Sequence, residues 1–337
     1  MTGRTEAMEA LLARSGWAGA HRAPLAGDAS RRCYVRLSQG EERRILMDAP
    51  PDPEHDVGPF IDMAEALAAR GLSVPAIHAR DAANGFLLLE DLGDALYSRH
   101  LLDAPEDEPL LYATAAAALA RMQADPAPAT LPAYPDLMPD LAGLAVDWYA
   151  PGADRAGLVA AMRDALGHPS VRDRVLVHRD FHADNLVWLP RREGAARVGM
   201  LDFQDAMRGP RDYDIASLVH DPRRPVSDAA QTAARDAWAD ATGRDADDIA
   251  AGIAICSAQR SLRILGVFAR LCLRDGKTRY VDFIPATWAA LRRDLEHPAL
   301  AGLRAVVDDA LPAPDAARLD AIRAGAGTRA GRERAVA

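Results

Sequence analysis

Val177-His-Arg-Asp-Phe-His-Ala-Asp-Asn-Leu186 is the most informative segment of this 337-residue chain. It contains the triplet His178-Arg179-Asp180, and Asn185 follows five residues after the aspartate. A second motif, Leu201-Asp202-Phe203, lies at the end of a predicted strand. A lone triplet recurs by chance and would also fit a charged surface loop. The full combination, with a hairpin between its parts, argues for a functional site.

The chemistry that these residues suit is phosphoryl transfer. That reaction needs a carboxylate to accept or orient the acceptor hydroxyl, and oxygen ligands that hold Mg²⁺ against the phosphates. Asp180 suits the first task. Asn185 and Asp202 suit the second, because Mg²⁺ prefers hard oxygen ligands. Strands expected at 186–189 and 198–201 form a hairpin that returns Asp202 beside Asn185, so we expect Asp180 as base and the other two as metal ligands.

A glycine-containing segment near the N-terminus is a candidate phosphate-binding turn. Its candidate nucleotide-binding residues are Gly27, Asp28, Ser30 and Arg32. Small and hydrogen-bonding neighbours around one glycine favour a tight turn whose backbone N–H groups lie over phosphates. An ordinary hairpin turn fits the same residues.

A candidate adenine-binding segment is Gly85-Phe-Leu-Leu-Leu-Glu-Asp-Leu-Gly-Asp94. An apolar strand runs directly into a polar turn, which is the expected form of a hinge between two lobes. The carbonyl of Glu90 and the amide of Leu92 are then placed to pair with the edge of adenine. The alternative is a strand that simply ends in a polar turn.

The order of predicted elements indicates an α+β, bilobal, protein-kinase-like fold. A small antiparallel β-rich N-lobe with one helix is expected over 1–92, and a larger, mostly helical C-lobe over 93–312. A tail over 313–337 is expected to fray, because it is rich in Ala, Arg and Gly. Strands are expected at 32–37, 43–47, 74–79 and 86–89, with a helix at 56–70. Helices are expected at 110–124, 140–149 and 155–166, and from 213 to about 309.

Composition argues against several other classes of protein. The net charge of −9 and the absence of a long Lys/Arg block disfavour a nucleic-acid partner. No apolar run reaches the ~18 residues of a membrane span. Cys33, Cys256 and Cys272 lack metal-ligand spacing and indicate reduced thiols. We therefore expect a cytoplasmic protein with a small-molecule substrate, and the sequence leaves its oligomeric state open.

Taken together, these segments resemble the aminoglycoside phosphotransferase/choline kinase superfamily. More narrowly, they resemble its anomeric N-acetylmuramate/N-acetylglucosamine kinase branch, which acts in cell-wall recycling. The segments that carry the resemblance are 27–34, 47–51, 85–94, 178–185, 201–214 and 259–277. The resemblance implies ATP and Mg²⁺ as cofactors and an amino sugar as acceptor. It gives Asp180, Asn185, Asp202 and Glu90–Leu92 the roles expected above.

The chain departs from the usual kinase pattern in its phosphate-binding cation. Lys277 is the only lysine and lies far from the strand that normally supplies one. The resembled branch also has Met-Asp at that position, here Met47-Asp48. Arg32 or Arg36 is the expected substitute, since guanidinium can bind phosphate with two hydrogen bonds.

Three functions remain open for this fold. The first is phosphorylation of the anomeric hydroxyl of an amino sugar, with Gln204, Asp205 and Arg260 as the expected sugar contacts. The second is an aminoglycoside or other amino alcohol as acceptor, although Arg208 and Arg211 disfavour a polycation. The third is a non-catalytic nucleotide-binding protein. The missing lysine favours this last function, but the presence of all three motif residues argues against it.

Overall fold

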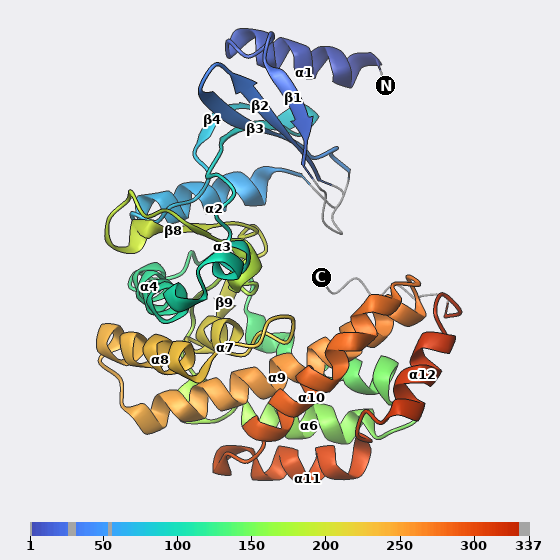
Figure 1. Ribbon diagram of the computed structural model, residues 1–337. Helices are drawn as coiled ribbons and strands as arrows, with labels where there is room; N and C mark the ends of the chain where they lie inside the picture. Colours follow the sequence, from blue (N-terminus) through green and yellow to red (C-terminus); the bar gives the residue numbers. More distant parts are fainter. Residues whose placement is uncertain (1, 26–31, 53–55, 330–337) are drawn as a thin grey trace. The chain divides into compact units, whose positions relative to one another are not determined.

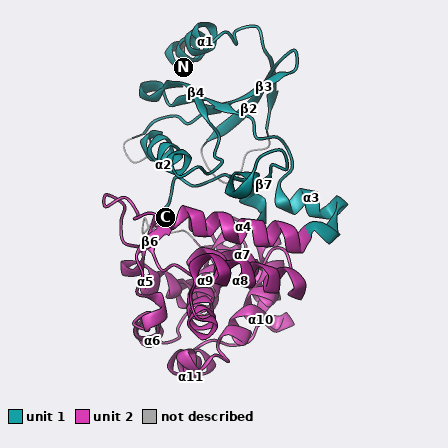
Figure 2. Cartoon of the chain, turned by 90° about the vertical axis from the view of Figure 1, so that its left-hand side faces the viewer, with its two compact units in different colours: residues 1–107, 183–206 teal, residues 108–182, 207–337 magenta. Residues whose placement is uncertain are grey.

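The computed structural model describes residues 2–25, 32–52 and 56–329. Within these ranges the chain divides into two compact units, coloured separately in Figure 2. Unit 1 takes the residues up to 107 together with 183–206, and unit 2 takes 108–182 and the residues from 207 onward. Compared with the expected boundary after residue 92, the segments 93–107 and 183–206 group with the N-terminal strands.

Unit 1 contains a five-stranded antiparallel sheet in the order β1-β2-β3-β5-β4. Its strands are β1 (His21–Pro24), β2 (Cys33–Gln39), β3 (Glu42–Asp48), β4 (Ile77–Asp81) and β5 (Phe86–Glu90). The turn between β2 and β3 is tight because Gln39 pairs with Glu42, and Gly40 adopts a φ of +62° there. Gly85 is also required, because an added Cβ would lie 1.9 Å from the carbonyl oxygen of Ala49.

Helices cover the two faces of this sheet, as Figure 1 shows. On one face, α1 (Thr2–Arg14) buries Leu11 and Leu12 in a cluster with Leu37 and Leu88. On the other side of the sheet, α2 (Gly58–Ala69) buries an apolar stripe that includes Phe60. Strand β5 lies between β3 and β4 and is apolar along four consecutive residues, as expected for a strand covered on both faces.

The rest of unit 1 includes α3 (Tyr97–Asp103) and a β-hairpin. The hairpin strands β7 (Leu186–Trp188) and β8 (Val198–Met200) pair antiparallel. The amide of Met200 donates to the carbonyl of Ser73 at 2.8 Å, and the amide of Trp188 donates to that of Ala95 at 2.8 Å. The hairpin is thereby tied into the same unit as the five-stranded sheet.

Unit 2 is built around α9 (Ala246–Leu273), a helix of 28 residues that is mostly buried. Asp245 caps its N-terminus by accepting the amide of Asp247 at 2.9 Å. Gly266 allows close packing, because an added Cβ would lie 2.3 Å from the backbone of Leu144. The other α-helices of the described part of this unit are α4 (Glu108–Met122), α5 (Met138–Ala142), α6 (Arg155–Ala165), α7 (Tyr213–Val219), α8 (Asp228–Thr242), α10 (Ile284–Asp294), α11 (Ala301–Ala310) and α12 (Ala316–Ala324).

Two short strands, β6 (Val175–Val177) and β9 (Met207–Gly209), pair antiparallel within unit 2. Strand β6 leads directly into the triplet that begins at His178. None of the helices in the described part of the chain has the length and apolarity needed to cross a membrane.

The expectation of a frayed tail was wrong over residues 316–329. Helix α12 forms there and packs on α9, with Ile322 buried. The thiol of Cys272 donates to the carbonyl of Ile322 at 3.3 Å, and the amide of Gly327 donates to the carbonyl of Cys272 at 3.1 Å. A buried isoleucine and these hydrogen bonds order a segment whose composition alone suggested disorder.

Candidate active site

The segment from His178 to His182 follows β6, and its backbone is held by Asp214 on α7. One carboxylate oxygen of Asp214 accepts the amide of His178 at 2.7 Å, and the other accepts the amide of Arg179 at 2.9 Å. Asp214 is completely buried, and burial raises its pKa to about 7 despite these two hydrogen bonds. The carboxylate therefore fixes the path of the chain into Asp180.

Arg179 adopts an unusual backbone conformation, with a φ of +78°. For a residue with a side chain this region costs roughly 1–3 kcal/mol, so the surrounding contacts must impose it. The guanidinium of Arg179 lies 5.0 Å from the centre of the Tyr134 ring, and the Tyr134 hydroxyl is 3.0 Å from that of Tyr213. The amide hydrogen bond to Asp214 holds the same residue from the backbone side. These contacts set the backbone direction at the next residue, Asp180.

Asp180 is half-buried and strongly influenced by cations. Burial raises its pKa, but the charges of Arg263, Arg260 and Arg179 outweigh burial and hold the pKa below the ordinary 3.8. Asp180 is therefore ionised at neutral pH, as a proton acceptor must be.

His182 is buried and neutral at pH 7. Its pKa falls to about 4 through burial and the charge of Arg223. The Nη1 of Arg223 lies 3.1 Å from Nε2 of His182. Since a guanidinium can only donate, Nε2 is the acceptor and carries no proton. His182 thus supports the loop and does not act as a cation at neutral pH.

The β7–β8 hairpin brings Asn185 and Asp202 together within unit 1. The amide of Leu201 donates to the carbonyl of Asn185 at 2.9 Å, so the residues at the two ends of the hairpin are adjacent. Asp202 has a φ of +59°, a second strained position among the described non-glycine residues. It is exposed, whereas Asn185 is half-buried. The expected hairpin is confirmed by the pairing of its strands.

Gln204 and Asp205, expected as sugar contacts, follow Asp202 in the chain. The side-chain amide of Gln204 donates to Asp202 at 2.8 Å and to Asp205 at 3.3 Å. Gln204 is buried and Asp205 is exposed. In this arrangement Gln204 orients the Asp202 carboxylate.

Asn185 and Asp202 present the oxygen atoms that a magnesium ion prefers. No group of three or more His, Cys, Asp or Glu side chains in the described ranges is arranged to hold a metal ion. A pair of oxygen ligands nevertheless fits Mg²⁺, which keeps several waters and takes phosphate oxygens as further ligands.

The residues expected at the phosphates are described only in part. Gly27, Asp28 and Ser30 lie outside the described residues. Arg32 is half-buried and directly precedes β2. Arg36, the alternative phosphate-binding cation, forms ion pairs with two carboxylates of the segment after β5.

Glu90 ends β5, and its amide donates to the carbonyl of Ala76 at 2.8 Å. Leu92 follows in the polar segment and packs on β8, where an added Cβ on Gly199 would lie 3.0 Å from its Cδ1. The predicted site residues divide between the two units. Unit 1 contains Arg32, Glu90, Leu92, Asn185, Asp202, Gln204 and Asp205, and unit 2 contains Asp180 and Arg260.

Arg260 lies on α9 and is buried, with 7% of its surface exposed. Its Nε has no hydrogen-bond partner among the described residues. Arg263 lies about one turn further along the helix and, like Arg260, lowers the pKa of Asp180. Sequence reasoning did not identify Arg263 or the anchoring role of Asp214, because both act through contacts between distant segments.

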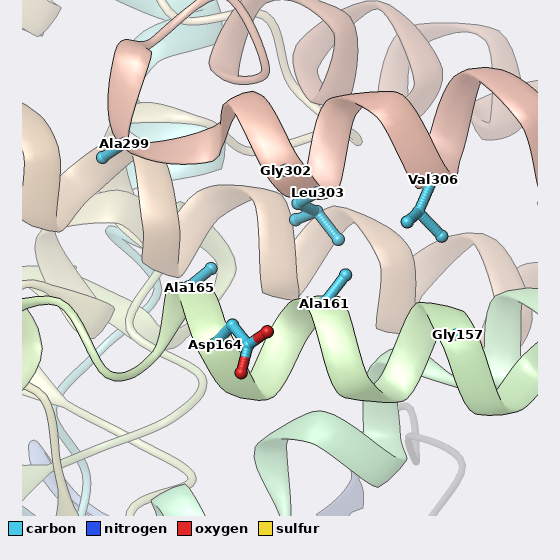
Figure 3. Close-up of a pocket in the computed structure, with 8 residues that line it drawn as sticks. All are labelled: Gly157, Ala161, Asp164, Ala165, Ala299, Gly302, Leu303 and Val306. Carbon is cyan, nitrogen blue, oxygen red and sulfur yellow. The ribbon is translucent and has the colours of Figure 1, made fainter.

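A separate groove lies between α6 and α11 (Figure 3). Ala161 and Leu303 point toward one another across it. Asp164 is the one charged residue among the eight that line it, and the others are small or apolar. None of the predicted site residues that the structure describes lines this groove, so it is not the candidate active site.

Comparison with known proteins gives the family. The model of the phosphotransferase enzyme family matches residues 21–252. N-acetylmuramate/N-acetylglucosamine kinase of Caulobacter vibrioides is 39% identical, over 92% of this chain and 97% of that protein. The protein with the same name from Pseudomonas aeruginosa is 36% identical, over 82% of this chain and 85% of that protein.

The crystal structure of a choline/ethanolamine kinase family protein from Mesorhizobium loti shares the fold. Its TM-score is 0.62 at 16% sequence identity, and the match covers 96% of this chain and 100% of that one. The expected α+β, protein-kinase-like fold is confirmed, with an antiparallel sheet in the N-terminal region and a mostly helical remainder. On the family match and the identity to these relatives, the chain belongs to the phosphotransferase enzyme family.

Proposed function

We propose that the protein is a kinase that transfers the γ-phosphoryl group of ATP to the anomeric hydroxyl of N-acetylmuramate or N-acetylglucosamine. The observation that carries this proposal is the 39% identity, over nearly the full length of both chains, to a kinase named for these two sugars. The three cysteines are unpaired in the structure, as expected for thiols in the cytoplasm, where we place this reaction as a step of cell-wall recycling.

Asp180 is the proposed catalytic base. An anomeric hydroxyl is more acidic than an ordinary alcohol, so a carboxylate deprotonates it with less driving force. Asp180 is ionised because nearby guanidinium groups lower its pKa. Asp214 holds the preceding backbone through the amides of His178 and Arg179. The loop is therefore organised before the acceptor arrives.

Membership of a kinase family implies ATP and typically a divalent metal. We propose Mg²⁺, held by Asn185 and Asp202, whose backbones the β7–β8 hairpin brings together. When bound, the ion neutralises charge on the phosphates. Gln204 orients the Asp202 carboxylate through a hydrogen bond of 2.8 Å.

The nucleotide is proposed to bind to the N-terminal region of the chain. Glu90 and Leu92 would pair with adenine through their backbone groups. The segment that contains Gly27, Asp28 and Ser30 would cover the phosphates, with Arg32 as the cation. The guanidinium of Arg36, the other candidate cation, is engaged by the carboxylates of Asp91 and Asp94.

The acceptor is proposed to contact Gln204, Asp205 and Arg260. Arg260 and Arg263 add positive charge around Asp180. A buried cation without a full set of partners is costly unless it meets an anion. The lactyl carboxylate of N-acetylmuramate is such an anion, whereas a polycationic aminoglycoside would be repelled. The charge around Asp180 therefore favours the amino sugar over the aminoglycoside.

The test is to incubate the purified protein with ATP, Mg²⁺ and one acceptor at a time: N-acetylmuramate, N-acetylglucosamine or kanamycin. Phosphorus NMR then locates the new phosphate. We expect a phosphate monoester on the anomeric carbon of both sugars and none on kanamycin. Phosphorylation of kanamycin alone would favour the aminoglycoside function. ATP binding without turnover on any acceptor would favour the non-catalytic one.

A further inference from the structure

The polar segment Glu90–Asp94, which begins at the end of β5, is held by two arginines from different parts of unit 1. We propose that Arg36 and Arg192 are positioning residues that fix this segment for binding the adenine base. The proposal rests on the proposed function, in which ATP is the phosphoryl donor. Both arginines then serve the binding of the adenine base, and neither binds the phosphates.

Arg36 on β2 reaches two carboxylates of the segment. Its Nη1 and Nη2 donate to the two oxygens of Asp94 at 3.0 and 2.9 Å. Its Nη2 also donates to Asp91 at 3.1 Å, and its Nε forms an ion pair with Asp91 at 2.7 Å. The fork of the guanidinium thus joins both carboxylates, which the point charge of a lysine could not do in the same geometry.

Burial makes this contact stronger than an ordinary surface ion pair. The side chain of Asp91 is only 5% exposed and that of Arg36 is 17% exposed. Removing one partner of a mostly buried pair leaves the other charge without compensation, which is strongly unfavourable. The hydrogen bonds from Arg36 also lower the pKa of Asp94, so this carboxylate stays ionised and paired well below neutral pH.

Arg192 holds the other end of the segment. It lies in the connection between β7 and β8, and its Nη2 donates to the carboxylate of Glu90. Its Nη1 donates to the hydroxyl of Ser73 at 2.7 Å, and that hydroxyl donates to the carbonyl of Ala196 at 2.6 Å. Arg192 therefore links Glu90 to the same hairpin that carries Asn185 and Asp202.

Backbone contacts complete the restraint. The amide of Gly93 donates to the Asp91 carboxylate at 2.9 Å, and the amide of Glu90 donates to the carbonyl of Ala76 at 2.8 Å. Leu92 is in packing distance of Gly199 on β8. A binding segment that is already ordered loses little conformational entropy when its ligand arrives, which raises affinity. The two arginines supply this order from opposite ends.

The experiment compares the affinities of adenosine and ATP, measured by isothermal titration calorimetry on the intact protein and on Arg36→Met. If Arg36 positions the segment for the base, both affinities fall by a similar factor, about tenfold. If Arg36 bound the phosphates instead, the affinity for ATP would fall and the affinity for adenosine would stay unchanged. That result would overturn the proposal. Unchanged affinity for both ligands, with only a lower melting temperature, would overturn it as well.

Arg22→Met is the matched control. Arg22 on β1 forms a two-pronged ion pair with Glu9 at 2.6 and 2.8 Å, in the same unit but away from the segment. We expect this variant to keep wild-type affinity for adenosine. If Arg22→Met lowered the affinity for adenosine as much as Arg36→Met does, loss of any ion pair in the unit would have the same effect, contrary to the proposal.

Two further variants keep the test independent of folding and of catalysis. If Arg36→Met fails to fold, Arg36→Lys retains the charge without the fork, and a similar fall in both affinities is expected. Arg192→Met should lower the affinity for adenosine in the same way. If this variant keeps the wild-type affinity for adenosine, Arg192 is not a positioning residue. Adenosine binding needs no turnover, so a wild-type protein that fails to phosphorylate either sugar would contradict the proposed function and leave this comparison valid.

Discussion

The amide of Leu201 donates a hydrogen bond of 2.9 Å to the carbonyl of Asn185. This contact closes the end of the β7–β8 hairpin, so that the next residue, Asp202, emerges beside Asn185. Two residues that are separated by 16 others in the chain become neighbours through three paired positions. The proposed metal site depends on this short piece of sheet.

Asp202→Ala tests the metal assignment. Loss of this carboxylate should raise the KM for Mg·ATP by about tenfold, equivalent to ~1.4 kcal/mol, and raise the Mg²⁺ concentration needed for half-maximal activity. Steady-state kinetics at varied Mg²⁺ measures both. Asp205→Ala is the matched control and should leave the Mg²⁺ dependence unchanged. Equal effects of the two substitutions would contradict the assignment.

Asp214→Asn tests the anchoring of the catalytic segment. Asparagine keeps one oxygen acceptor but turns an N–H₂ group toward a backbone amide, so one of the two hydrogen bonds is lost. We expect unfolding free energy to fall by about 1–3 kcal/mol. We also expect kcat to fall more than the KM for ATP rises, since the loop carries Asp180. Urea unfolding and kinetics on the same preparation check this, and a variant with unchanged kcat would argue against the anchoring role.

Arg260→Met tests how the acceptor is recognised. N-acetylmuramate carries a carboxylate that N-acetylglucosamine lacks, so the KM for the former should rise by about tenfold while that for the latter changes little. Arg270→Met, further along α9, is the control and should leave the ratio of the two KM values unchanged. If the KM rose by a similar factor for both sugars, Arg260 would support the loop or bind the phosphates, and would not recognise the acceptor carboxylate.

His182 predicts a pH dependence of stability. Burial and the charge of Arg223 lower its pKa from 6.5 to about 4 in the folded protein. Between these values the unfolded chain binds the proton more readily, so stability is lost as the pH falls from about 6.5 to about 4. His182→Gln keeps an acceptor for Arg223 but cannot titrate. Urea unfolding at several pH values should show a shallower slope for this variant, and an identical slope would contradict the prediction.

Much of the fold could be predicted because its signals are local. The β2–β3 hairpin, α2 and β5 follow from periodicity and turn residues, and β7 and β8 follow from short apolar runs between polar segments. Helix α1 was not predicted, because its charged and apolar residues show no clear stripe, and only the sheet reveals that Leu11 and Leu12 are buried. Helix α12 was missed for the same reason, since its order comes from α9.

The candidate site could be predicted only as far as its residues lie in one motif. Asp180, Asn185 and Asp202 are identified by spacing along the chain. Asp214 lies 35 residues along the chain from Arg179, whose amide it accepts. Arg36 lies 55 and 58 residues from Asp91 and Asp94, with which it forms ion pairs. Such contacts depend on which strands and helices become neighbours. Sequence reasoning therefore offered Arg36 as a phosphate ligand, whereas the structure shows its guanidinium bound to two carboxylates.

Asp180→Asn provides the most direct test of phosphoryl transfer with Asp180 as the base. Asparagine preserves the shape of the side chain but cannot take up a proton at neutral pH. With N-acetylmuramate as acceptor, we expect kcat to fall by about a hundredfold to ten-thousandfold, while the affinity for ATP, measured by calorimetry, changes by less than about twofold. A variant that keeps a near-native kcat would contradict the assignment of Asp180 as the catalytic base.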